Sequence, residues 1–122
     1  MAIGRIKIGN TQISRLIIGG NPISGVSHQN PEMDEAMKRY FTVSRIKDTL
    51  RSAEELGIGT FIGRADRHIT RMLYEYRSEG GKIQWIAQTC PEMQNNRRSV
   101  EDALSEGASA CYIHGGVMDN LF

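Results

Sequence analysis

All three histidines of this 122-residue chain lie in polar segments that follow short apolar runs. Imidazole groups change charge near neutral pH and therefore donate and accept protons readily. His114 directly follows the last apolar run, and His68 follows an earlier one, with Asp66 two positions before it. We therefore predict acid–base catalysis by His114 and His68, with Asp66 as the carboxylate that orients an imidazole.

Neighbouring polar residues favour the binding of a small polar or anionic molecule. Arg64 is suited to a carboxylate or phosphate ligand, because its planar guanidinium donates two parallel hydrogen bonds. Loops are polar in most proteins, so a second interpretation is that Arg64 and Asp66 only tie a loop down. The residues expected to contact a substrate are Arg64, Asn21, His28, Gln88 and Glu92.

Spacing gives little support to a metal centre or to a nucleophilic thiol. The histidines and Asp66 are suitable ligand types for zinc, manganese or iron, but the sequence has no HxH or HExxH pattern, and no metal is predicted. Cys90 and Cys111 lie in or at the end of apolar runs and do not form a CxxC pair. Buried, reduced thiols are expected for both, which favours a cytoplasmic protein.

The composition excludes several classes of protein. Apolar residues make up 39% and charged residues 24% of the chain, and the formal net charge is +1, as in ordinary globular domains. This balance gives no sign of a nucleic-acid partner or of an anionic membrane surface. No run approaches the ~18 apolar residues of a membrane-spanning helix, and residues 1–10 lack a signal-peptide core.

Four apolar runs of strand length alternate with helical patterns, and these elements must position the candidate residues. Charged and apolar residues alternate around Gly9 and Asn10, which predicts an N-terminal hairpin before the first run. The expected strands are residues 16–18, 60–62, 83–87 and 110–113, and the expected helices are a short one after Pro31, one over 43–56, one over 69–76 and one before Gly107.

Three of these elements carry more specific expectations. The run 16–18 contains no polar residue and is expected to be a strand buried on both faces. Residues 21–31, which include Ser24, are typical of a polar loop. The last helix is expected to have its N-cap at Ser99. Its expected inward-facing residues are Val100, Ala103 and Leu104.

The alternation of strands and helices predicts an α/β fold with parallel strands, built as an N-terminal hairpin plus four β/α units in a single domain of residues 1–122. A doubly wound sheet would carry a GxGxxG turn after its first strand, but Asn21 and Pro22 follow the Gly19-Gly20 pair, and the chain has no GxxxxGK[ST] loop. We therefore expect half of a TIM-type barrel, in which the site lies at the carboxyl ends of the strands.

Four motifs, taken in order, resemble the first half of the aldo-keto reductases. The N-terminal hairpin followed by SRLIIGG is similar to the opening of that family, in which a hairpin closes the bottom of a (β/α)8 barrel. The segments ELGIGTFIGRAD, QWIAQTC and ACYIHGG resemble the family's second, third and fourth strands. The resemblance implies a barrel fold, redox chemistry on carbonyl compounds and a nicotinamide cofactor.

One position of the family's catalytic tetrad matches this chain. His114 occupies the place of the catalytic histidine. The aspartate, tyrosine and lysine positions correspond to Gly63, His68 and Cys90, so the phenolic proton donor and the lysine that lowers its pKa are missing. The family binds its cofactor mostly through the second half of the barrel. The resemblance therefore implies atypical acid–base or redox chemistry rather than a usual NADPH-dependent carbonyl reductase.

A half-barrel leaves two strand edges unpaired, which gives alternatives to an enzyme. Edge pairing between two copies would close a ring of eight strands, so a non-catalytic module that forms homo-oligomers is a second hypothesis. A third is a fragment of a longer barrel enzyme, because a complete (β/α)8 barrel needs roughly 250 residues. The expected partners are a small-molecule ligand and a second copy of the chain, with no nucleic acid and no membrane.

Overall fold

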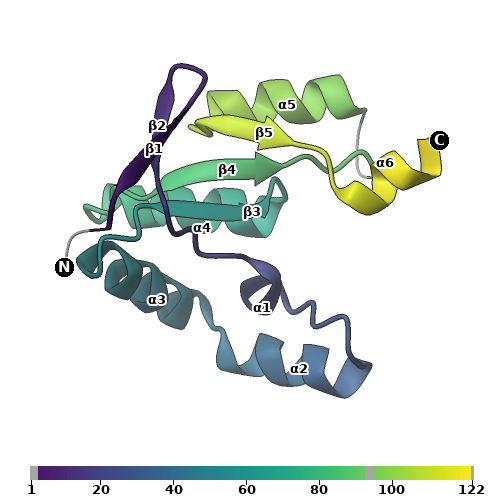
Figure 1. Cartoon of the computed structure of the whole chain (residues 1–122). Helices are drawn as coiled ribbons and strands as arrows, with labels where there is room; N and C mark the ends of the chain where they lie inside the picture. Colours follow the sequence, from purple (N-terminus) through teal and green to yellow (C-terminus); the bar gives the residue numbers. More distant parts are fainter. Residues whose placement is uncertain (1–2, 93–94, 122) are drawn as a thin grey trace.

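The computed structural model describes residues 3–92 and 95–121, which form six helices and two sheets (Figure 1). An antiparallel hairpin comes first along the chain, and a parallel sheet of three strands follows with helices between its strands. The predicted α/β class is confirmed by this alternation.

The predicted hairpin is formed by β1 (Arg5–Ile8) and β2 (Thr11–Ser14). Gly9 in the connecting turn has a φ of 58°, a left-handed conformation that favours glycine. The hairpin is anchored on the parallel sheet, because the Ser14 amide and hydroxyl each lie 3.1 Å from the Thr60 hydroxyl. It therefore packs at the amino ends of the parallel strands, at the left in Figure 1.

The parallel sheet has the order β3 (Thr60–Arg64), β4 (Gln84–Gln88) and β5 (Ala110–Tyr112). Three predicted strands are thus confirmed, with shifts of one or two residues at their ends. Strands that are consecutive in the sequence are neighbours in the sheet, and all three point the same way. Their carboxyl ends therefore share one edge, at the right in Figure 1.

The first apolar run is not the fully buried strand that we expected. It makes one isolated parallel bridge, between Ile18 and Phe61, and Leu16 and Ile17 are 57% and 38% exposed. The Ser14 hydroxyl donates to the Leu16 carbonyl at 2.5 Å. This local bond bends the chain and takes a carbonyl that a longer ladder would use, so pairing with β3 is limited to Ile18.

Three helices, α3 (Val43–Glu55), α4 (Arg67–Ser78) and α5 (Asn96–Ser105), pack on one face of the parallel sheet. The Trp85 indole N–H donates to the Gly63 carbonyl at 3.1 Å, within the core between sheet and helices. The buried side chains of this core are Ile23 from α1 (Asn21–Ser24) and Ile46, Leu50, Phe61, Ile69, Met72, Leu73, Tyr76, Ile83, Trp85, Ala87 and Ala103.

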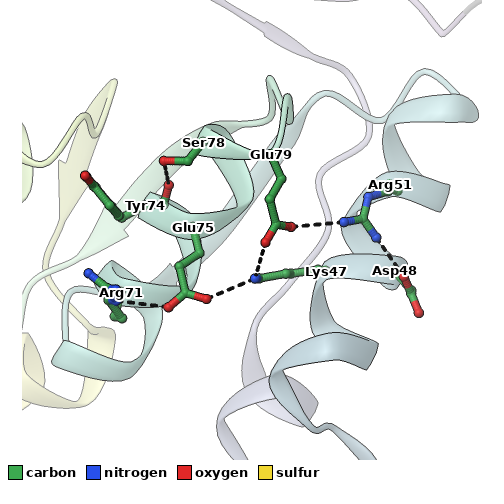
Figure 2. Close-up of polar contacts among 8 residues, drawn as sticks. All are labelled: Lys47, Asp48, Arg51, Arg71, Tyr74, Glu75, Ser78 and Glu79. Atoms are coloured by element: carbon green, nitrogen blue, oxygen red, sulfur yellow. Dashed lines mark hydrogen bonds and ion pairs between the residues drawn. The ribbon is translucent and has the colours of Figure 1, made fainter.

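An ion-pair network joins α3 to α4 along their outer seam (Figure 2). Lys47 is 9% exposed, and its Nζ lies 3.0 Å from Glu75 Oε1 and 2.7 Å from Glu79 Oε1. Arg51 adds a contact of 3.2 Å to the other oxygen of Glu79. Nearby carboxylates raise the pKa of Lys47 through hydrogen bonds, and Lys47 in turn lowers the pKa of Glu75.

The start of α5 corrects the predicted N-cap. Asn95 is the cap, and its side chain accepts from the Arg98 amide at 2.9 Å. Ser99 lies inside the helix, where its hydroxyl accepts from the Cys90 amide at 3.0 Å and so joins α5 to the end of β4. Leu104, which we expected to face the core, is 50% exposed, whereas Ala103 is buried as predicted.

The segments beyond the carboxyl ends of the strands contain more helix than predicted. The expected loop over 21–31 begins with a short helix, α1 (Asn21–Ser24). The helix predicted after Pro31 is confirmed as α2 (Pro31–Tyr40), and its N-cap is Asn30. After β5, where the expected helices did not include one, α6 (Gly115–Leu121) follows.

Both cysteines are free thiols, of which Cys90 is buried, as predicted, and Cys111 is half-buried. Burial raises the pKa of each thiol, so both favour the neutral form. Among the described residues, none of the helices combines the length and the hydropathy needed to cross a membrane.

Candidate functional site

A cavity of about 460 Å³ lies at the carboxyl edge of the parallel sheet, where the sequence predicted the site. Asn21, Arg64 and Gln88, three of the five residues predicted to contact a substrate, line it together. The complete lining is Ile18, Gly19, Gly20, Asn21, Pro22, Ser24, Ile62, Gly63, Arg64, Gln88 and Tyr112.

The polar wall of this cavity is a row of side chains from three neighbouring strands. Arg64 pairs in register with Gln88, and Gln88 pairs with Tyr112. Residues paired in register project from the same face of a sheet, so these three side chains lie next to one another. The Tyr112 hydroxyl donates to Gln88 Oε1 at 2.9 Å, and burial raises the pKa of Tyr112. The amide of Gln88 is therefore oriented, with its NH2 group left to donate.

The charge of Arg64 is compensated within the protein. Its Nε lies 3.3 Å from Asp66 Oδ2, and its Nη2 lies 2.6 Å from Glu92 Oε1. Burial opposes the charge of Arg64, but the hydrogen bond to Glu92 and the surrounding acidic groups raise its pKa overall. Two carboxylates beside one guanidinium leave a negative balance. This arrangement disfavours the anionic ligand that was one of our two expectations and favours an uncharged one.

Asp66 has a structural role at the start of α4. Its Oδ1 accepts from the Ile69 amide at 2.9 Å, which makes it the N-cap of the helix. Its other oxygen holds Arg64. Both oxygens of the carboxylate are therefore occupied by the protein itself, and Asp66 orients Arg64 rather than a histidine.

The opposite wall of the cavity carries a buried polar group without a partner. The Ser24 hydroxyl of α1 is buried and has no hydrogen-bond partner in the structure. Gly20, just before α1, brings this wall close to β3, because a Cβ there would lie 2.8 Å from the Ile62 carbonyl oxygen. The Ser24 hydroxyl oxygen is shielded from solvent, so the polar groups that a molecule in the cavity can reach are those of the strand wall.

His114 follows β5 and is exposed. Its Nδ1 accepts from the Gly116 amide at 3.0 Å, so the Nε2 atom is the nitrogen that remains accessible. Burial works to raise the pKa of Glu92, but its own backbone amide, Arg64 and the charge of His114 together lower it. His114 thus lies within electrostatic reach of the Arg64–Glu92 pair, although it does not line the cavity.

The structure places the other two histidines away from this cavity. His68 is exposed on the first turn of α4, and His28 is exposed on the loop before α2, where its charge acts on Asp34. In the part of the chain that the structure describes, no group of three or more His, Cys, Asp or Glu side chains is positioned to hold a metal ion. The histidines and Asp66 therefore do not form the metal site considered as an alternative.

The residues at the cavity do not fit the nicotinamide cofactor that the resemblance implies. A dinucleotide needs an anion-binding group for its pyrophosphate, usually the N-terminus of a long helix after a glycine-rich turn. Here Gly20 leads into α1, which has four residues, and Arg64 is neutralised by two carboxylates. We therefore derive no step through such a cofactor.

Sequence reasoning missed Tyr112 and did not single out Ser24. Tyr112 belongs to a run that the pattern marked only as an apolar strand. Its alternation with Cys111, which packs against the core, was the available signal for a side chain on the cavity face.

Comparison with protein-family models, with curated proteins and with solved structures finds no match to this chain. The relation to aldo-keto reductases therefore stays a prediction.

Proposed function

We propose that this protein binds a small, uncharged, polar metabolite in the cavity at the carboxyl edge of the parallel sheet. The observation that carries this proposal is the row of Arg64, Gln88 and Tyr112, whose polar side chains line the cavity next to one another. Molecules with several hydroxyl or amide groups satisfy such a wall best, because Gln88 and Asn21 offer both donors and acceptors. Arg64 also lines the cavity, and it can donate from the N–H groups that Asp66 and Glu92 do not use.

His114 is the residue that we propose for acid–base chemistry on a bound molecule. It is the predicted catalytic histidine that acts on Glu92, the ion-pair partner of Arg64 in the cavity wall. His68 and Asp66 remain predictions, and the geometry gives them less support, because no described interaction joins His68 to the cavity residues and Asp66 caps a helix. In this proposal His114→Ala abolishes turnover of the bound molecule and leaves the fold intact.

Matched probes test the binding proposal. A neutral hexose, the corresponding aldonate anion and the corresponding amino sugar are titrated into the labelled protein, and amide shifts are followed by NMR. We expect the neutral sugar to bind most tightly and to shift residues around Gln88. Gln88→Ala should weaken binding by about 2- to 10-fold, the value of one hydrogen bond. Gln29→Ala, which removes an exposed amide side chain on the loop before α2, is the control. Tighter binding of the aldonate would refute the neutral-ligand proposal.

A second candidate function is the oligomerising half-barrel. Helices α3, α4 and α5 cover one face of the sheet, while Ile62, Ile86 and Ala110 on the other face are only half-buried. Parallel strands in sequence order with one helical layer are the arrangement of a TIM-type barrel segment, so we propose that two copies pair through these faces and edges in the cytoplasm. Light scattering decides this: a monodisperse monomer at micromolar concentration would exclude it.

A further inference from the structure

A second cavity, a groove of about 720 Å³, lies between α4 and α5 on the outer side of the helical layer. It is separate from the carboxyl-edge cavity, since no residue lines both. Its walls are Arg67, Thr70, Arg71 and Tyr74 from α4 and Asp102, Ala103, Ser105 and Glu106 from the end of α5, and its floor is Ala65, Asp66 and Cys90.

The seam between α4 and α5 differs from the seam between α3 and α4. The α3–α4 seam is closed by Lys47 and its two glutamates (Figure 2). Between α4 and α5, the described polar contacts across the seam lie near the C-termini of both helices, where Arg77 donates to the carbonyls of Glu106 and Gly107 at 3.1 and 3.3 Å. Nearer the N-terminus of α4, the groove is open.

Two opposite charges at the ends of this groove have no partner among the described residues. The Arg67 guanidinium, at the first residue of α4, makes no described ion pair or hydrogen bond. The same holds for the Glu106 carboxylate, at the end of α5. The N-terminus of α4 adds to the charge of Arg67, whereas Arg77 already donates to the last carbonyls near the end of α5, so the negative charge at that end is the Glu106 side chain. The groove therefore has a positive and a negative end.

The distance between the two ends sets the length of the occupant. Arg67 and Tyr74 are seven residues apart on α4, which is about 10 Å, and Glu106 lies beside Arg77, almost one turn further. The charged ends are thus roughly 10–15 Å apart. An extended peptide spans about 3.3–3.6 Å per residue, so three or four residues would bridge them.

We propose that this groove binds a short extended peptide with free ends, its carboxylate at Arg67 and its ammonium group at Glu106. The peptide backbone lies along Thr70 and Ser105, whose side chains line the groove between and beside its charged ends. Tyr74, which is 58% exposed, offers its ring as a contact surface for the chain. The proposal is independent of the carboxyl-edge cavity and its ligand.

Tetraglycine, its N-acetylated form and its C-terminal amide test the proposal by NMR titration of the labelled full chain at millimolar concentration. We expect tetraglycine to shift the amides of residues 67–74 and 102–106, and both blocked peptides to bind more weakly. Arg67→Gln and Glu106→Gln should each weaken binding about two- to fivefold, the range for one exposed ion pair. A dispersed spectrum confirms that each variant folds.

Arg97→Gln is the matched control, because Arg97 is an exposed arginine of α5 that pairs with Glu101 and does not line the groove. It should leave tetraglycine binding unchanged. The proposal is overturned if tetraglycine shifts no groove residue, if the blocked peptides bind equally well, or if Arg67→Gln and Arg97→Gln have the same effect.

Discussion

The Tyr112 hydroxyl donates a hydrogen bond of 2.9 Å to Gln88 Oε1, from one strand of the parallel sheet to the next. This bond fixes the Gln88 side chain, because an amide whose oxygen is held cannot turn over freely. The row of Arg64, Gln88 and Tyr112 therefore presents a defined set of donors to the cavity.

Tyr112→Phe removes this bond and keeps the ring. We expect affinity for a neutral sugar to fall by about 2- to 10-fold, because Gln88 is no longer oriented. The free energy of unfolding should change by less than about 1 kcal/mol, since Tyr112 is 37% exposed. Tyr40→Phe, at the exposed end of α2, is the control for loss of a phenol. Unchanged affinity in Tyr112→Phe would show that Gln88 does not need this bond.

Gly20→Ala tests the close approach of α1 to β3. The new Cβ would meet the Ile62 carbonyl at 2.8 Å and the Gly63 Cα at 3.2 Å, so the wall that carries Ser24 must move. We expect a loss of about 1–3 kcal/mol in the free energy of unfolding, typical of overpacking, and weaker ligand binding. The neighbouring Gly19→Ala is the control, because a Cβ there would contact nothing within 4 Å. Equal urea midpoints for both variants would contradict the close approach.

Two variants of Asp66 distinguish its role as the N-cap of α4 from its ion pair with Arg64. Asn and Asp are equally good N-caps, so Asp66→Asn should keep the stability of α4 while it weakens the hold on Arg64. Asp66→Ala removes the cap and should cost about 1 kcal/mol in urea unfolding. If Asp66→Asn is as unstable as Asp66→Ala, the pairing with Arg64 rather than the cap stabilises this end of the helix.

The Lys47 network predicts how stability depends on pH. The folded-state pKa of Glu75 is lowered from 4.5, so its contribution is present above that pH and is lost as the pH falls through the lower, folded value. The folded-state pKa of Lys47 is raised from 10.5, so its contribution is complete below 10.5 and is lost as the pH rises through the higher value.

Urea unfolding across this pH range measures both effects. In the native chain, we expect the contribution of this network to the free energy of unfolding to be constant between the acid loss from Glu75 and the alkaline loss from Lys47. Lys47→Met should reduce the loss at acid pH that Glu75 causes, because its main partner is gone, and should abolish the loss at alkaline pH that Lys47 causes. Arg39→Met, which breaks an exposed pair with Glu35 on α2, is the control. Identical profiles for Lys47→Met and the native chain would contradict the prediction.

Apolar spacing predicted most of the fold because it records which face of an element is buried. It placed three parallel strands and the helices between them within a few residues. It could not show that the run 16–18 makes only one bridge, since that depends on the bond from Ser14 to Leu16. It also placed the N-cap of α5 wrongly at Ser99 instead of Asn95, because both residues are good caps and the Ser99 hydroxyl is used in a contact with Cys90.

The candidate site was predicted in part, by the rule that polar residues after parallel strands gather at one edge. That rule brought Asn21, Arg64 and Gln88 together. It included His28 and His68 as well, because it cannot tell a residue that ends a strand from one that begins the next helix or loop. Tyr112 depends on strand register, which one sequence does not record.

The indole of Trp85 is fully buried, hydrogen-bonded to Gly63, and the single tryptophan of the chain. Its emission is therefore a signal from one place, the seam between β3 and β4 beneath the helices. A ligand in the α4–α5 groove contacts neither Trp85 nor Gly63 and should leave the emission unchanged, whereas separation of the two strands should shift the emission to the red. Gly63 lines the carboxyl-edge cavity, so the intrinsic fluorescence of this protein reports on unfolding and on that cavity but not on the groove.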